Sequence, residues 1–131
     1  MPKQVVTSSK LPAPSGHFAQ ATVIEAKGRL LFISGMLAKD ASGQMVGIGD
    51  IEAQTRQVCE NLKSAVEAAG GTLEDICRVD VYIRNMEQFP QIHKVRREYF
   101  TGVAPASTMV EVSKFTTPDA LIEINAIAAL A

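Results

Sequence analysis

The sequence predicts one α+β domain in which two helices pack on one face of a mixed β-sheet of five or six strands. Three observations predict it. The chain has 131 residues, which favours a single domain covering 1–131. Two segments have apolar residues at helical spacing, and the remaining apolar runs have the shorter period of strands. Because each helix has only one apolar stripe, both can cover one face of the same sheet.

The amino-terminal part is expected to contain a loop and then a β-hairpin. Residues 10–16 are rich in proline and glycine and predict an irregular loop. Two β-rich runs, 21–26 and 30–35, are separated by a short segment around Gly28. Glycine tolerates the positive φ that a tight turn often requires, so this pattern predicts a hairpin. Residues 40–49 contain three glycines and predict turns with a short strand.

The first helix is the clearest element of the sequence. Apolar side chains recur three and four positions apart from Ile51 to Ala69, which predicts an amphipathic helix. Its charged residues fall largely on the other faces. Gly70-Gly71 should end the helix, because glycine accepts the left-handed conformation found at helix carboxyl ends.

The second half predicts a strand, a helix and two further strands. Residues 77–84 alternate apolar and polar side chains, as a half-buried strand does. Asn85 is expected to cap the second helix, with Gln88 completing a capping box. The last two strands are expected at 107–114 and 121–130.

The last strand leaves one sheet face to be explained. Ile122, Ile124 and Ala126 share one face, and Glu123 and Asn125 share the other. Two helices cover only one side of a sheet, so the other side is a half-apolar surface. Such a surface predicts self-association.

Composition limits the partners and the location. The chain carries 13 basic and 14 acidic residues, with a net charge of −1, so no nucleic-acid partner is expected. No apolar run approaches the roughly 20 residues of a membrane span, and the amino terminus lacks the apolar core of a signal peptide. A soluble cytoplasmic protein is therefore expected.

Cys59 and Cys77 are too few and too far apart for a metal site, and each is expected to be a buried small hydrophobe.

The chain resembles the RidA (YjgF/UK114) family over essentially its full length. No single motif is specific to the family, but the order and spacing of the matching motifs along the chain are. The matching segments are Gly16-His17-Phe18-Ala19-Gln20-Ala21, Leu31-Phe32-Ile33-Ser34-Gly35, Gln54-Thr55, Asn61-Leu62, Ala68-Ala69-Gly70-Gly71, Asn85-Met86 with Phe89, Tyr99-Phe100, Pro105-Ala106-Ser107-Thr108-Met109-Val110-Glu111-Val112 and Ile122-Glu123-Ile124.

The resemblance implies a chorismate-mutase-like α+β fold that assembles as a homotrimer, with substrate pockets in the clefts between subunits. It also implies a cofactor-independent activity, the hydrolysis of reactive imines and enamines to 2-keto acids and ammonia. Some members carry endoribonuclease labels, which the charge balance does not favour.

Position 107 departs from the deaminases of that family. They carry an arginine two residues after the proline of a Pro-Ala-Arg motif, and its guanidinium binds the substrate carboxylate through two hydrogen bonds. Here the residue is Ser107, which cannot neutralise a carboxylate. Losing a charge-assisted hydrogen bond costs about 1.5–3 kcal/mol. The usual 2-imino acids are therefore expected to be poor substrates, unless Arg29, Arg84 or Arg96 binds the substrate carboxylate instead.

The resemblance assigns the other pocket positions. Glu123 is retained, and its carboxylate suits a general base that activates water. The alternative is an ordinary solvated or inter-subunit residue. Gly35 would let a ligand approach the main chain. The substrate-binding positions are Phe18, Ser34, Gly35, His93, Ser107 and Met109.

Two of these positions have other interpretations. His93, beside Lys94, Arg96 and Arg97, fits a solvated basic helix face as well as a pocket. Ser107 is expected to line the pocket rather than act as a nucleophile, since the sequence shows no His-Asp partnership.

The sequence thus predicts a RidA-family small-molecule hydrolase, of an imine or enamine deaminase kind, with substrate choice altered at Ser107. The substrate is expected to be less anionic or more apolar than 2-iminopropanoate. The alternative is a non-catalytic trimeric module that binds or senses a small metabolite.

Overall fold

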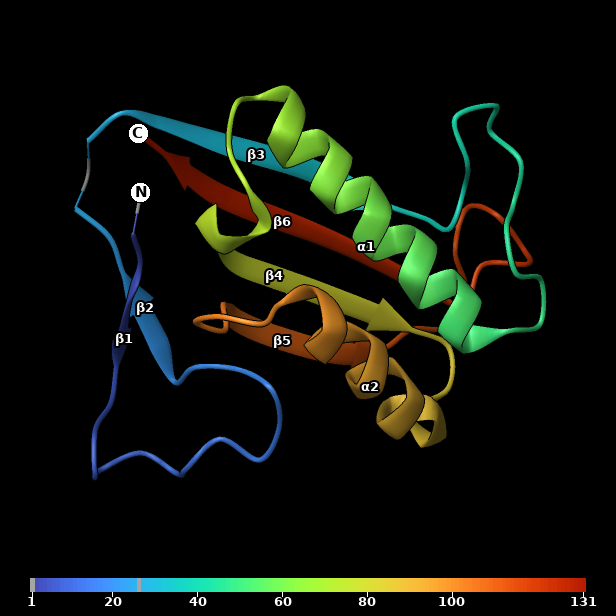
Figure 1. Cartoon of the computed structure of the whole chain (residues 1–131). Helices are drawn as coiled ribbons and strands as arrows, with labels where there is room; N and C mark the ends of the chain where they lie inside the picture. The colour runs from blue at the N-terminus through green and yellow to red at the C-terminus, as the bar shows by residue number, and fades with distance from the viewer. Residues whose placement is uncertain (1, 26) are drawn as a thin grey trace.

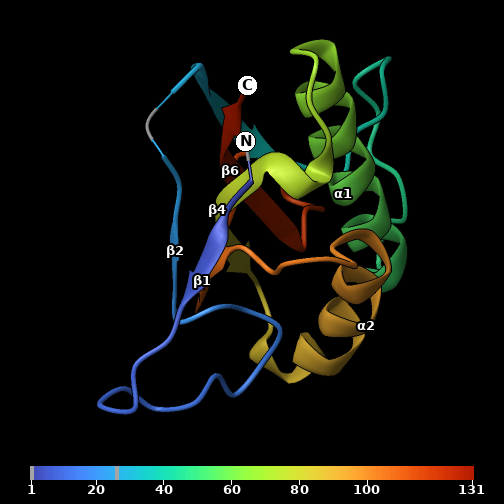
Figure 2. The same ribbon diagram turned by 60° about the vertical axis from the view of Figure 1, so that its left-hand side comes forward.

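The computed structural model describes residues 2–25 and 27–131. Its centre is a four-stranded sheet in the order β3-β6-β4-β5, where β3 is Arg29–Met36, β4 Ile76–Ile83, β5 Ala106–Glu111 and β6 Ile122–Leu130. β4 and β5 are parallel, and the other neighbours are antiparallel. Both α-helices cover the same face of this sheet (Figures 1 and 2). The predicted α+β class, with two helices on one face of a mixed sheet, is confirmed, but this sheet has four strands rather than five or six, because β1 and β2 form a sheet of their own.

Helix α1 spans Ile51–Ala68 and has the ends that its sequence predicts. The Asp50 side chain accepts a hydrogen bond from the Ala53 amide, 3.1 Å away, which satisfies one of the unpaired donors of the first turn. Gly70 follows the last turn with a φ of +90°. The predicted glycine stop is confirmed.

Helix α2 spans Phe89–Tyr99, and the predicted capping box at its start is wrong. Asn85 does cap, but it accepts from the Glu87 amide and begins a short 3-10 turn, η2, at Met86–Gln88. The side-chain oxygen of Gln88 is buried and accepts no hydrogen bond from the described residues, so it does not reach back to the cap. The α-helix begins only after this turn.

The predicted hairpin between 21–26 and 30–35 is also wrong. Strand β2 (Ala21–Val23) pairs with β1 (Gln4–Val6) in a separate antiparallel ribbon, whereas β3 pairs with β6. Gly28 has the expected positive φ of 74°. A glycine shows that the chain can turn, but the nine-residue β6 offers β3 a longer pairing surface than β2 does. Ala26, within the predicted first run, lies outside the described residues, and the short strand expected in 40–49 is only a bridge between Lys39 and Met45.

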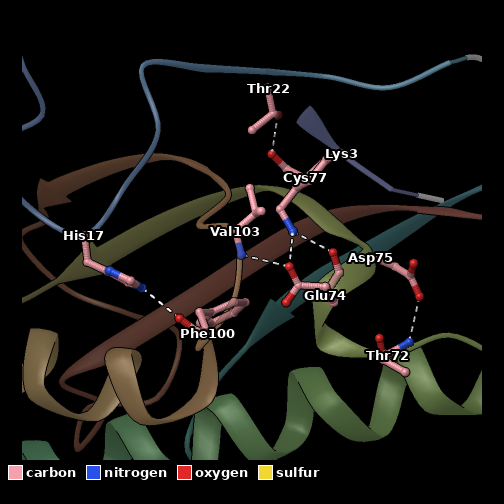
Figure 3. Close-up of polar contacts among 9 residues, drawn as sticks. All are labelled: Lys3, His17, Thr22, Thr72, Glu74, Asp75, Cys77, Phe100 and Val103. Atoms are coloured by element: carbon pink, nitrogen blue, oxygen red, sulfur yellow. Dashed lines mark hydrogen bonds and ion pairs between the residues drawn. The ribbon is translucent and has the colours of Figure 1, made fainter. Parts of the chain in front are cut away.

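The β1–β2 ribbon lies at one end of the sheet, where β4 begins (Figure 1). The buried Lys3 ammonium donates to the main-chain oxygen of Glu74 at 2.5 Å and lies 3.7 Å from that residue's carboxylate (Figure 3). Burial lowers the pKa of Lys3. The Thr22 hydroxyl donates to the main-chain oxygen of Cys77 at 3.0 Å. These contacts fix the ribbon against the turn η1 (Leu73–Asp75) that precedes β4.

The core lies between the helices and the sheet. Strand β6 alternates as predicted: Ile122 and Ile124 are fully buried against the helices, while Glu123 and Asn125 are half-buried on the opposite face. That opposite face carries the exposed side chain of Phe32, which is 69% accessible. Within the described residues, no helix is long and apolar enough to cross a membrane.

The two cysteines differ in their surroundings. Cys59 is fully buried, as predicted, and burial raises its pKa to about 12. Cys77 is only half-buried, and its Sγ lies 3.4 Å from the main-chain oxygen of Ile127. In the part of the chain that the structure describes, no three His, Cys, Asp or Glu side chains form a group that could hold a metal.

Candidate active site

The site residues expected from the sequence lie on two sides of the same sheet. Glu123 stands between two isoleucines that are buried against the helices, so its own side chain faces away from them. Ser107 accepts a hydrogen bond from Arg96 of α2, so it faces the helices. We call Gly35, Tyr82, Lys114 and Glu123 the open-face cluster, and His17, His93, Arg96 and Ser107 the helix-side cluster.

The open-face cluster is built by close approach of three strands. Glu123 on β6 is directly opposite Tyr82 on β4. On its other side β3 has a bulge between Ile33 and Met36, and there Gly35 comes so close that an added methyl group would overlap the Glu123 carboxylate. Gly35 has no positive φ in this structure. Glycine is therefore required at position 35 because any side chain would collide with the Glu123 carboxylate, and not because of the backbone conformation.

A shallow, open pocket of about 340 Å³ adjoins this carboxylate. Tyr82 and Lys114 line it together with Glu123, so a carboxylate, an ammonium group and a phenol are available to one small ligand. Such a set can place a water molecule and accept its proton. No sequence pattern selected Tyr82 or Lys114, because only the register of β4 against β6 and the path of the 112–116 segment bring them to Glu123. The other lining residues are Val112, Phe115 and Thr116.

The helix-side cluster centres on a buried guanidinium. Arg96 is 2% exposed, and its Nη2 donates to Ser107 Oγ at 3.1 Å. Among the residues that the structure describes, its Nε has no hydrogen-bond partner and no carboxylate forms an ion pair with Arg96. Burial lowers its pKa. Of the three arginines that the sequence offered, Arg29 donates to Ala69 O and Arg84 is exposed, so only Arg96 reaches position 107.

His93 belongs to this cluster, and its interpretation as part of a solvated basic face is wrong. Its side chain is 6% exposed and its ring lies against Phe89, with centroids 4.0 Å apart. Burial, and then the positive charges of Arg96 and Arg97, lower the pKa of His93 to about 4. The ring is therefore neutral at physiological pH.

The amino-terminal loop covers His93, which explains why its helix position alone was misleading. The His17 amide donates to Nε2 of His93 at 2.8 Å, and Gly16 packs against the same ring. Nε2 is thus the unprotonated nitrogen, and the proton is on Nδ1, which is buried with no partner among the described residues. The His17 ring in turn lies 2.9 Å from the main-chain oxygen of Phe100 (Figure 3).

Phe18 and Met109 both lie near Ser107. The amide of Ala19 donates to Pro105 O at 3.3 Å, which holds half-buried Phe18 beside the start of β5. Met109 lies two residues after Ser107 and packs against the core. Most of the expected residues therefore divide into two groups. His93, Ser107 and Met109 lie on the helix side, and Gly35 and Glu123 belong to the open face. Phe18 lies beside the start of β5, and Ser34 lies in the bulge of β3.

Together these features define an α+β domain with candidate small-molecule-binding groups on both faces of its sheet. The chain matches the family model Endoribonuclease L-PSP over residues 8–130, and it belongs to that family, the RidA (YjgF) family.

Relatives and solved structures agree with this assignment. The chain is 44% identical over 126 residues to a RutC family protein of Pyrococcus horikoshii, covering 96% of this chain and 97% of that protein. It is 35% identical over 128 residues to the 3-aminoacrylate deaminase RutC of Acinetobacter baylyi, covering 98% of each.

Among solved structures, a Rid family protein of unknown function from Yersinia pestis superimposes with a TM-score of 0.89 at 33% identity, covering 99% of this chain and 100% of that one. TdcF of E. coli with bound serine superimposes with a TM-score of 0.73 at 26% identity, covering 98% and 99%.

Proposed function

We propose that the protein is a cofactor-independent hydrolase that deaminates imine or enamine substrates, with Glu123 as the general base. The observation that carries the proposal is the Glu123 carboxylate, which borders an open pocket on the uncovered sheet face and to which Gly35 gives room. Similarity to a 3-aminoacrylate deaminase over nearly the full chain supports the deaminase class.

The proposed site lies between two copies of the chain in a homotrimer. In one chain the open-face cluster and the helix-side cluster lie on opposite sides of the sheet, so a single copy does not bring Glu123 and Ser107 to one substrate. A neighbouring copy can supply the missing half. The exposed apolar side chains of Leu30 and Phe32 on β3 favour contact between copies.

The proposed reaction needs only water and a base. Glu123 accepts a proton as the water oxygen attacks the carbon of the C=N bond, the C–N π electrons move to nitrogen, and Glu123 returns this proton to nitrogen to give the carbinolamine. Glu123 then accepts the hydroxyl proton of the carbinolamine and passes it to nitrogen as the C–N bond breaks. Nitrogen leaves as ammonia and the oxygen remains as the carbonyl, so that imine plus water gives carbonyl compound plus ammonia. An enamine enters the same sequence after tautomerising to the imine.

Substrate choice is proposed to differ from that of the usual family deaminases because position 107 offers a neutral hydroxyl. Serine donates one hydrogen bond where arginine donates two charge-assisted ones. With this feature alone, binding of a 2-imino acid should be weaker by tenfold or more.

The test is the release of ammonia and keto acid from 2-iminobutanoate generated in situ. We expect Glu123→Gln to lower kcat at least a hundredfold, because general-base catalysis contributes about 10²–10⁴-fold. The exposed Glu60→Gln on α1 is the matched control and should leave kcat unchanged. Ser107→Arg should raise activity on the 2-imino acid. Equal turnover by wild type and Glu123→Gln would refute the assignment of the base.

A second candidate function is a trimeric module that binds or senses a small metabolite without turning it over. The neutral side chain at position 107 favours it. In that case a ligand raises the Tm while no imine or enamine is consumed, and Glu123→Gln leaves the ligand's affinity largely intact.

A further inference from the structure

Tyr82 on β4 lies directly opposite Glu123 on β6 in the register of the two antiparallel strands. Directly opposed residues project from the same face of a sheet, with their Cβ atoms about 4.5–5.5 Å apart. Both side chains are half-buried, and both line the open pocket of about 340 Å³. A small ligand in this pocket therefore meets the phenol and the carboxylate together.

In the described part of the chain, the polar side-chain atoms of Tyr82 and Glu123 have no hydrogen-bond or ion-pair partner. The next polar residues on the same face differ in this respect. Asp80 accepts from Arg78 at 2.7 Å and from Asn125 at 3.0 Å, so these three side chains satisfy one another. Only the phenol and the carboxylate beside the pocket are left to bond a ligand.

Tyr82 is a better proton carrier than Lys114, the other donor beside Glu123. Lys114 is exposed, and an ammonium group is strongly hydrated on a flexible stem. Strand β4 has a neighbouring strand on each side, which fixes the position of Tyr82. A group that relays a proton must accept one as it donates another. A phenol can do both, whereas an ammonium group has no acceptor.

We propose that Tyr82 is a second catalytic residue, which carries the proton from Glu123 to the substrate nitrogen. After water has attacked, the protonated Glu123 carboxyl donates to Tyr82 Oη while the phenol O–H donates its own proton to nitrogen. One O–H bond forms at Oη as another breaks, so Tyr82 ends neutral. The same transfer is repeated when the C–N bond of the carbinolamine breaks and ammonia leaves. The inference rests on the proposed hydrolysis and names the route of its proton.

Removal of the phenol oxygen tests the relay through kcat for ammonia release from 2-iminobutanoate generated in situ. Tyr82→Phe keeps the ring in the pocket wall, so KM should be nearly unchanged. General acid–base catalysis contributes about 10²–10⁴-fold, and we expect kcat to fall at least tenfold because Glu123 then transfers the proton directly and more slowly. Tyr99→Phe is the matched control. Tyr99 is the other of the two tyrosines, lies on α2 and should be replaceable without loss of kcat.

A second test changes the acidity of the phenol and keeps its oxygen. In the Tyr99→Phe protein Tyr82 is the only tyrosine, so biosynthetic incorporation of 3-fluorotyrosine labels this site alone. Fluorine makes the phenol more acidic with little change in size. Because the relay requires the protonated phenol, the alkaline limb of the kcat–pH profile should move to lower pH. A purely structural role for Tyr82 would leave the limb in place, and that result would overturn the proposal.

The variants separate failure of the relay from failure of the proposed function. Equal kcat in wild type and Tyr82→Phe, together with a loss in Glu123→Gln, refutes the relay alone. A larger loss of kcat in Lys114→Met than in Tyr82→Phe also refutes it, since the ammonium group would then be the main donor. No ammonia release above the spontaneous rate by the wild-type protein overturns both proposals. If Tyr82→Phe does not fold, the fluorotyrosine protein decides.

Discussion

At the residue scale, His93 should make stability depend on pH. Its pKa is lowered from 6.5 to about 4 in the folded state, so the unfolded chain binds the proton more readily. The stabilisation is complete above about pH 6.5 and is lost as pH falls toward 4. With about 1.4 kcal/mol per pKa unit, the free energy of unfolding should drop by on the order of 2 kcal/mol between pH 7 and pH 4.5.

Urea denaturation at several pH values checks this expectation. His93→Gln lacks the titrating ring, so its curve should be flatter by that amount over the same interval, while the carboxylates contribute equally to both proteins. If the free energy of unfolding fell equally with pH in wild type and variant, protonation of His93 would not destabilise the folded state.

Sequence reasoning at this scale found residues but not their partners. The family pattern selected Glu123 and Gly35, and the structure places them in contact. It also selected Ser107, and Arg96 was one of three arginines in the sequence that could replace the missing cation. Which turn of α2 lies against β5 is a property of tertiary packing, so the hydrogen bond between Arg96 and Ser107 was not predictable.

At the scale of elements, Gln54 joins the start of α1 to two loops. Its fully buried amide donates to Gly47 O at 3.2 Å and Asp119 O at 3.0 Å, and accepts from the Leu121 amide at 2.8 Å. Gln54→Leu would leave these backbone groups without partners, so we expect a loss of about 2–4 kcal/mol in unfolding free energy. Gln57→Leu, half-buried on the same helix, should cost less than about 1 kcal/mol. Equal losses in urea denaturation would contradict this role for Gln54.

Local periodicity predicted the elements well and their pairing poorly. The stripe of α1, its glycine stop and the alternation of β6 each depend on neighbouring residues, and each is confirmed. The pairing of β3 with β6 joins residues 88 to 101 positions apart, and no local pattern encodes it. A glycine at position 28 therefore suggested a hairpin that the long-range pairing overrides.

At the scale of the whole molecule, Glu123 and Ser107 lie on opposite faces of the sheet, and this predicts how oligomers mixed from two variants should behave. Glu123→Gln disables the open-face half, and Ser107→Phe fills the helix-side half, so each homo-oligomer should be inactive. If each site takes Glu123 from one copy and Ser107 from a neighbour, random mixing at equal amounts restores both groups in about one site in four. Refolding the two variants together should then recover about one quarter of wild-type ammonia release, whereas a site within one chain recovers none. Co-refolding each variant with itself is the control, and native mass spectrometry, which resolves the mass difference between the two variants, establishes that mixed oligomers form.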